Sequence, residues 1–289
     1  MGACKALEKE GFEVTYLPVD KHGLVDLAEL IHQIRTDTTL VSIMAVNNEV
    51  GTIQNIKAIG KICKENNVIF HTDAVQAFGA LKLDVVDMEI DAMSISSHKI
   101  YGPKGVGALY VRNGIRIENL IDGGHQERNK RGGTTNVPAV VGFGKAAEIT
   151  VRDLAVYNQK MKSLRDYFVK QINAKIPYVV INGHPHQKAN NIVNISFELI
   201  EGESILLLLD FEGIAVSTGS ACTSGALEPS HVLKAMGVED ETSQGSIRFS
   251  FGRSTTKADI DYTVEKLVEV VDRLRKMSPQ TKSAKKGDK

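Results

Sequence analysis

The sequence has 289 residues, of which 42% are hydrophobic and 24% charged; this is typical of a globular protein and excludes a collagen-like or long disordered chain. Lys and Arg total 35, as do Asp and Glu, so the net charge is zero and we expect no nucleic-acid partner. We also expect no membrane partner, because no stretch has the apolar length that spans a bilayer. Three scattered cysteines and the lack of a signal pattern predict a cytoplasmic protein.

Short β-rich runs alternate with helical patterns over the first two-thirds of the chain. This alternation predicts an α/β fold with a mostly parallel sheet. Strands are expected at residues 40–46, 68–73, 92–96 and 107–111. Apolar residues at helical spacing over 53–65 predict the helix of a β-α-β crossover between the first two strands.

A long helix over residues 138–176 is predicted next, because apolar residues recur there at steps of three and four. We expect the domain boundary near its middle, which gives a large domain of residues 1–150 and a smaller α+β domain of residues 151–289. In the smaller domain we expect strands at 191–197, 213–216 and 246–251, and helices at 204–211, 229–236 and 257–276.

A lysine follows the end of the third expected strand, in the string Ser96-Ser97-His98-Lys99. Ligands of α/β sheets gather at the carboxyl ends of strands. A lysine close to the core there would be desolvated and easily deprotonated, as a Schiff-base lysine must be. Ser96 and His98 could bind a phosphate at the same strand end. An exposed loop lysine is the alternative.

A carboxylate ends the preceding expected strand. Asp73 could pair with the protonated pyridine nitrogen of pyridoxal 5′-phosphate (PLP), and Gln76 could donate to its phenolic oxygen. Asp73 could instead only cap a helix. Together with Ser96, His98 and Lys99, these residues predict a PLP site.

Three further features could bind anions. Asn48 follows the first expected strand, where an amide could bind a carboxylate or a cofactor ring; a plain turn is the alternative. Residues 131–134 combine an arginine, two glycines and Thr134, which suits a phosphate. Arg248 lies in an expected strand among apolar residues, where a substrate carboxylate would fit its guanidinium; a structural ion pair is the alternative.

Cys222 lies in a run of Gly, Ser, Thr and Ala over residues 217–226. Inert buried cysteines usually lie among Leu, Ile and Val, as Cys63 does in its predicted helix. We therefore interpret Cys222 as an accessible nucleophile whose thiolate is the reactive form. A loop with an incidental cysteine is the alternative.

Other cofactor and metal motifs are incomplete. Residues 105–110 lack the third glycine of a dinucleotide fingerprint, and no phosphate loop ending in Gly-Lys-Ser/Thr occurs. His184 and His186 have no cysteine or acidic residue nearby, so we interpret their segment as a loop and expect no metal.

Three strings resemble those of the cysteine desulfurases of the NifS/IscS type, within the fold-type I PLP enzymes (aminotransferase class V). They are HTDAVQ at 71–76, SHKIYGPKG at 97–105 and STGSAC at 217–222, and the similarity runs from Ala3 to the region of Pro279. The third string is similar to the longer cysteine loop of this type, not to the shorter loop of the selenocysteine-lyase branch. The resemblance implies a PLP-dependent transferase fold with a large domain and a smaller C-terminal domain.

The resemblance also implies residue roles. Catalysis would depend on Lys99, which would bind PLP covalently, on Cys222, which would take the substrate sulfur as a persulfide, and on His98. Asn48 and Arg248 would bind the substrate carboxylate. The cofactor contacts would be Asp73, Gln76, Ser96, His98, Lys99, Asn48 and, across a homodimer interface, Thr134.

The implied reaction converts L-cysteine to L-alanine and passes sulfur to an iron–sulfur scaffold or another sulfur-acceptor protein. Chains of this family begin well before the position of Ala3, so we expect the sequence to be the C-terminal, major part of such an enzyme. An incomplete sheet would leave apolar surface exposed. The alternatives are a selenocysteine lyase or other class V enzyme, and a catalytically impaired remnant that only binds partners.

Overall fold

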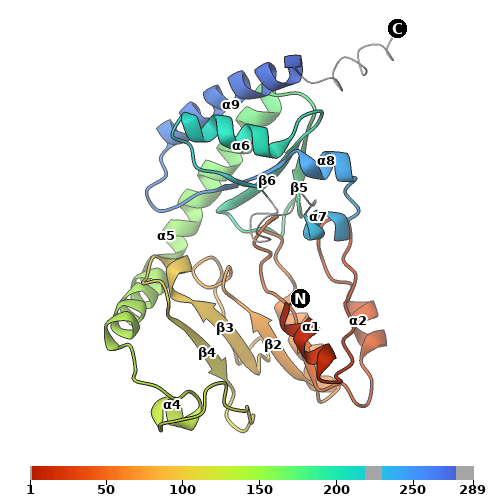
Figure 1. Cartoon of the computed structure of the whole chain (residues 1–289), viewed down its shortest axis with the longest axis vertical. Helices are drawn as coiled ribbons and strands as arrows, with labels where there is room; N and C mark the ends of the chain where they lie inside the picture. The colour runs from red at the N-terminus through yellow and green to blue at the C-terminus, as the bar shows by residue number, and fades with distance from the viewer. Residues whose placement is uncertain (1, 219–229, 278–289) are drawn as a thin grey trace.

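The computed structural model describes residues 2–218 and 230–277, which form two four-stranded sheets joined by one long helix (Figure 1). In the first sheet, β1 (Leu40–Ser42), β2 (Ile69–Asp73) and β3 (Ala92–Ser96) are parallel, and β4 (Gly107–Val111) pairs antiparallel with β3. The mostly parallel α/β sheet predicted from the sequence is therefore confirmed.

The crossover between β1 and β2 is helix α3 (Ile56–Glu65), which packs against β2. The side chain of Asn55 accepts a hydrogen bond from the Ala58 amide, and this cap sets the start of the helix three residues later than the apolar spacing predicted. Its buried face includes Ile59 and Cys63, which belong to the same apolar core as Phe70 of β2.

The long helix is α5 (Val137–Lys175), close to the predicted span of residues 138–176. Asn136 caps its N-terminus by accepting from the Ala139 amide. Its first half contacts the short 3₁₀ helix η1 (Ser97–Ile100) after β3, and its second half lies beside the second sheet (Figure 1). The domain boundary proposed at residue 150 falls inside this helix and stays a prediction.

The second sheet is antiparallel, in the order β5-β6-β8-β7. Its strands are β5 (Val179–Asn182), β6 (Ile192–Phe197), β8 (Ser246–Ser250) and β7 (Ser217–Thr218). Together with its helices it forms the α+β unit that the sequence predicted.

The strand expected at residues 213–216 is wrong. Gly213 has a φ of +73° and its amide bonds to the Asp210 carbonyl, so it ends helix α6 (Gly202–Phe211) instead of starting a strand. Pairing begins only at Ser217, opposite Arg248.

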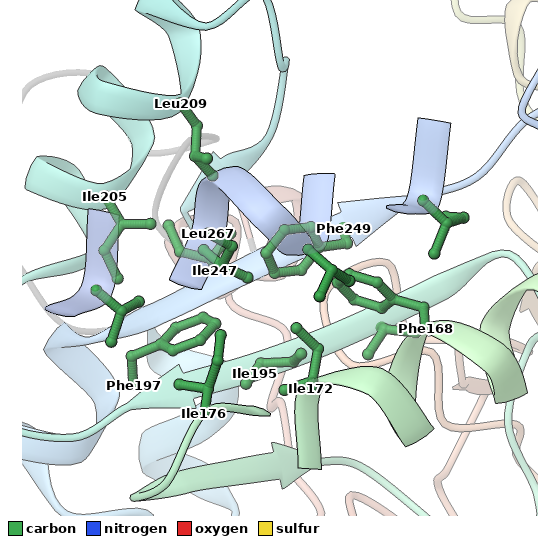
Figure 2. Close-up of a cluster of buried hydrophobic side chains, with 14 of the residues drawn as sticks. Phe168, Ile172, Ile176, Ile195, Phe197, Ile205, Leu209, Ile247, Phe249 and Leu267 are labelled. Atoms are coloured by element: carbon green, nitrogen blue, oxygen red, sulfur yellow. The ribbon is translucent and has the colours of Figure 1, made fainter. Parts of the chain in front are cut away.

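The main core of this unit lies between the sheet and three helices, α5, α6 and α9 (Lys257–Met277) (Figure 2). Phe168 of α5 is fully buried, and its ring centroid lies 4.9 Å from that of Phe249 and 5.5 Å from that of Phe251. Aromatic pairs at this spacing contribute beyond their buried area.

The remaining helices are short: α1 (Gly2–Lys9), α2 (Leu27–Gln33), α4 (Gln126–Asn129), α7 (His231–Ala235) and α8 (Asp240–Gln244). Large apolar side chains are exposed on the first sheet and the nearby half of α5, including Leu109 at 51% and Val151 at 65%. Among the described helices, none has the length and apolar character needed to cross a membrane.

Candidate functional site

The carboxyl ends of β1, β2 and β3 lie at one edge of the first sheet, because the three strands are parallel. The chain leaving β1 continues alongside β2, where the Ala45 amide donates to the Asp73 carbonyl at 2.8 Å. The Ala74 amide in turn donates to the Ser94 carbonyl at 2.9 Å. The segments that follow the three strands carry Asn48, Asp73 with Gln76, and Ser96 with His98 and Lys99, so six of the predicted site residues come from this edge.

Asp73 ends β2, where its half-buried side chain accepts a hydrogen bond from the Val75 amide at 2.9 Å. This bond makes a local turn that leads to Gln76. Gln76 and Lys99 line the same small hollow, of about 30 Å³, together with Tyr101 and Arg253. The structure therefore brings an amide from the segment after β2 and an amine from η1, after β3, to one cavity.

Ser96 ends β3, and its hydroxyl lies 2.9 Å from Nδ1 of His98. The chain then makes the single turn of η1, which closes at Tyr101 in the left-handed region, with a φ of +67°. Lys99 lies on this turn with its side chain exposed, so the desolvation expected for it from the sequence is wrong. Within the described residues, Lys99 makes no ion pair.

His71 begins the HTDAVQ string, and no role was predicted for it. Its Nδ1 lies 2.8 Å from the Ser42 hydroxyl and its Nε2 lies 2.9 Å from the Ser94 hydroxyl, so it links β1 and β3 through β2. Burial lowers the pKa of His71, and the charge of Asp73 opposes this. A neutral imidazole thus lies on the same sheet face as Asp73, two residues away.

A cation from the second sheet approaches this edge. Arg248 on β8 donates from Nη1 to the carbonyl oxygen of Asn48 at 3.0 Å. Its Nε is buried without a hydrogen-bond partner in the described part of the chain, and no described carboxylate forms an ion pair with it. The charge of the Glu49 carboxyl acts on Arg248 at longer range than an ion pair. A buried cationic donor without a direct ion pair favours binding of an acidic group over the structural ion pair.

Of the two cysteines discussed from the sequence, Cys63 lies within the described residues and Cys222 does not. Cys222 lies in residues 219–229, outside the described residues, so its assignment as nucleophile rests on the sequence. Cys63 is fully buried in α3, and burial raises the pKa of its thiol to about 12. A thiol with that pKa is almost entirely protonated near neutral pH, which excludes Cys63 as an efficient nucleophile.

Thr134 is exposed and follows Gly133, whose φ of +104° favours glycine. It makes no hydrogen bond within the described chain that would hold it at the sheet edge. Its assignment to a phosphate across a dimer interface is neither supported nor opposed by this geometry.

The donor set at the edge fits PLP. An exposed primary amine at Lys99 suits the aldehyde, and the Asp73 carboxylate suits a protonated pyridine nitrogen. The hydrogen-bonded pair of Ser96 and His98 offers a hydroxyl and an imidazole to a phosphate. All three groups come from the ends of neighbouring strands, as a flat cofactor across the sheet edge requires.

Comparisons with known proteins agree with this geometry. The aminotransferase class-V family model matches residues 1–263. "Cysteine desulfurase IscS" of Methanosarcina thermophila is 54% identical over 278 residues, covering 96% of this chain and 69% of the relative. "Cysteine desulfurase IscS" of Dictyoglomus turgidum is 51% identical over 276 residues, covering 96% and 70%.

Among solved structures, one titled "NIFS-LIKE PROTEIN" superposes with a TM-score of 0.87 at 40% identity, covering 94% of this chain and 71% of that one. The resemblance read from the three sequence strings is therefore confirmed, together with the fold and the PLP-dependent class that it implied. The chain belongs to the aminotransferase class-V family of PLP-dependent enzymes, among its NifS/IscS-type cysteine desulfurases.

Proposed function

We propose that the chain acts as a PLP-dependent cysteine desulfurase, which converts L-cysteine to L-alanine and transfers the sulfur to Cys222. The observation that carries this proposal is that three groups come from the two sheets. The first sheet contributes the amine of Lys99 and the carboxylate of Asp73 at one edge, and the second sheet contributes the cation of Arg248, which forms no ion pair with a described residue.

PLP, when bound, supplies a ring that withdraws electrons and so acidifies the Cα proton of the amino acid attached to it. The Asp73 carboxylate keeps a proton on the pyridine nitrogen, and Gln76 donates to the phenolic oxygen. Ser96 and His98 bind the phosphate. Lys99, exposed and without an ion pair among the described residues, accepts a proton from Cα and returns one to the product.

The substrate carboxylate is bound by Arg248, whose Nη1 is held in place by the Asn48 carbonyl at 3.0 Å. This contact uses Nη1 and leaves Nε without a hydrogen-bond partner in the described chain, so the guanidinium keeps donors for a planar anion. The side-chain amide of Asn48 adds a donor beside the same carboxylate.

The sulfur transfer then balances as a substitution at the substrate sulfur, with Cβ as the leaving group. The Cys222 thiolate forms an S–S bond with the sulfur of L-cysteine as the Cβ–S bond breaks. The electron pair of that bond stays on carbon, which takes up a proton and leaves as the methyl group of alanine. Both sulfur atoms are oxidised to the persulfide level while Cβ is reduced, so no external oxidant is needed.

Two partner assignments belong to this proposal. The persulfide passes to an iron–sulfur scaffold or another acceptor protein, as the resemblance implies. The chain pairs as a homodimer in which Thr134 reaches the phosphate of the neighbouring subunit's cofactor. The exposed position of Thr134 is compatible with such a contact.

The test is an assay of the purified chain with PLP and L-cysteine. We expect equal amounts of alanine and of persulfide plus released sulfide, with persulfide located on Cys222 by alkylation and peptide mass spectrometry. Cys222→Ser should abolish sulfur release, and Cys63→Ser serves as the matched control. Sulfur release that persists in Cys222→Ser would overturn the proposal. Release from selenocysteine but not from L-cysteine would instead assign a selenocysteine lyase.

A further inference from the structure

Glu49 is a buried acid for which the mechanism above has no role. It directly follows Asn48 in the turn after β1 and is only 4% exposed. Glutamate is rarely buried to this degree unless it is paired. Its partner is the hydroxyl of Ser230, which donates to Oε2 at 2.5 Å, and Ser230 is equally buried.

The turn that carries Glu49 is itself held rigidly. The side chain of Asn47 accepts from the amides of Glu49 and Val50, at 2.9 and 3.0 Å. Gly51 closes the turn with a φ of +75°, and its amide donates to the Asn47 carbonyl at 3.0 Å. Burial raises the pKa of the Glu49 carboxyl, while the hydrogen bond from Ser230 lowers it.

Ser230 joins this turn to helix α7. Its hydroxyl caps the helix by accepting from the amides of Val232 and Leu233, at 3.2 and 3.3 Å. Leu233 of α7 and Met236, which directly follows this helix, pack with Val50 in a small buried cluster. One hydroxyl therefore both starts the helix and attaches it to the turn that contains Asn48.

Ser230 is also the first described residue after the segment 219–229, in which Cys222 lies. The last described residues before that segment, Ser217 and Thr218, pair with Arg248 and Ile247 of β8. Arg248 in turn donates to the Asn48 carbonyl. The described residues on both sides of the cysteine segment are thus attached to the turn after β1. Ser217 is attached through Arg248 and Asn48, and Ser230 through Glu49.

We propose that Glu49 is a positioning residue for sulfur transfer, because its bond to Ser230 fixes the C-terminal end of the Cys222 segment beside the substrate-binding turn. The inference rests on the proposed function, in which Cys222 receives the sulfur. Glu49 touches neither substrate nor cofactor in this role; it bonds to Ser230, and its carboxyl also interacts electrostatically with His231 and Arg248.

The test compares variants of the full chain loaded with PLP, in a single turnover with L-cysteine. Glu49→Ala and Ser230→Ala should each slow persulfide formation on Cys222 at least threefold, and leave the affinity for L-cysteine, read from the cofactor absorbance, within twofold. The double variant should be no slower than the slower single variant, because both act through one contact. Glu49→Gln keeps an oxygen acceptor for Ser230 and should restore at least half of the lost rate.

Ile205→Val, in the core of the second unit, is the control for a general loss of stability and should leave the persulfide rate within twofold of wild type. A slowing of less than threefold in Glu49→Ala, or a Gln variant as slow as the Ala variant, would overturn the inference. If the wild-type chain itself forms no persulfide, the proposed function fails instead.

A second measurement tests, without any turnover, whether the bond between Glu49 and Ser230 holds α7 against the turn after β1. Glu49→Ala should raise hydrogen exchange at the amides of Val232 and Leu233 at least threefold, and leave the exchange of α9 unchanged. Unchanged exchange in α7 would overturn the inference even if the chain is inactive.

Discussion

Replacing Arg248 with lysine keeps the positive charge but removes the planar fork of donors. In the structure, one guanidinium nitrogen is used by the Asn48 carbonyl and the buried Nε has no partner in the described chain. A lysine ammonium at this position can make one bond to a carboxylate where arginine can make two. We therefore expect Arg248→Lys to weaken the binding of the L-cysteine carboxylate.

The magnitude follows from the loss of one hydrogen bond to a charged group, which is worth about 1.5–3 kcal/mol. This corresponds to a fall of roughly 10- to 150-fold in kcat/KM for L-cysteine. The side chain of Arg248 is only half-buried, so we expect a value in the lower half of this range.

The assay measures alanine formation by the PLP-loaded protein and, in parallel, ligand affinity from the cofactor absorbance. Cysteamine is the matched ligand, because it has the thiol and amine of cysteine without the carboxylate. Arg248→Lys should weaken binding of L-cysteine and leave that of cysteamine within twofold.

Arg275→Lys is the control variant, since Arg275 also donates to backbone carbonyls but lies on α9. Equal weakening for both ligands, or a loss of less than threefold in kcat/KM, would refute the assignment of Arg248.

Three further predictions concern groups around the site and the core. Because the folded pKa of His71 is lowered, its contribution to stability is present above the unfolded value of about 6.5 and is lost as pH falls below that value through the lower folded pKa. The urea midpoint should therefore drop more between pH 7.5 and 5.5 in wild type than in His71→Asn, and parallel curves would contradict this. Phe168→Ala should lower the free energy of unfolding by about 3–5 kcal/mol, because it empties the centre of an aromatic cluster; a urea titration giving under about 1 kcal/mol would contradict the packing. Cys63→Ala should leave sulfur release within twofold, since the Cys63 thiol is buried with a pKa of about 12, and abolished release would contradict the assignment of Cys222.

The limits of helices and strands could be predicted closely from the sequence where Gly and Pro residues mark a turn beside them. The strands at 92–96 and 107–111 have the predicted limits, because a Gly/Pro turn separates them, and the long helix was found from the repeat of its apolar residues. The strand at 213–216 was misplaced because Gly213 serves the preceding helix end. Strand β5 was missed because its four residues follow closely on a long helix and are too few to show an alternating pattern.

The candidate site could be predicted only where the chemistry is local. Asp73, Ser96 and Lys99 come at strand ends, and the parallel topology brings such ends together. The exposure of Lys99 depends on where the single turn of η1 directs it, which the sequence does not encode locally. Glu49 looked like part of a plain turn, because its partner Ser230 lies far along the chain and the contact between them forms only in the folded protein.

The most direct test of the PLP site is to trap the cofactor on the protein. The purified chain would be incubated with PLP, reduced with borohydride and digested for peptide mass spectrometry. We predict a pyridoxyl group on Lys99, and a total pyridoxyl incorporation that falls at least tenfold in Lys99→Ala and is reduced in Asp73→Ala. Label spread evenly over other exposed lysines, with no preference for Lys99, would contradict the site.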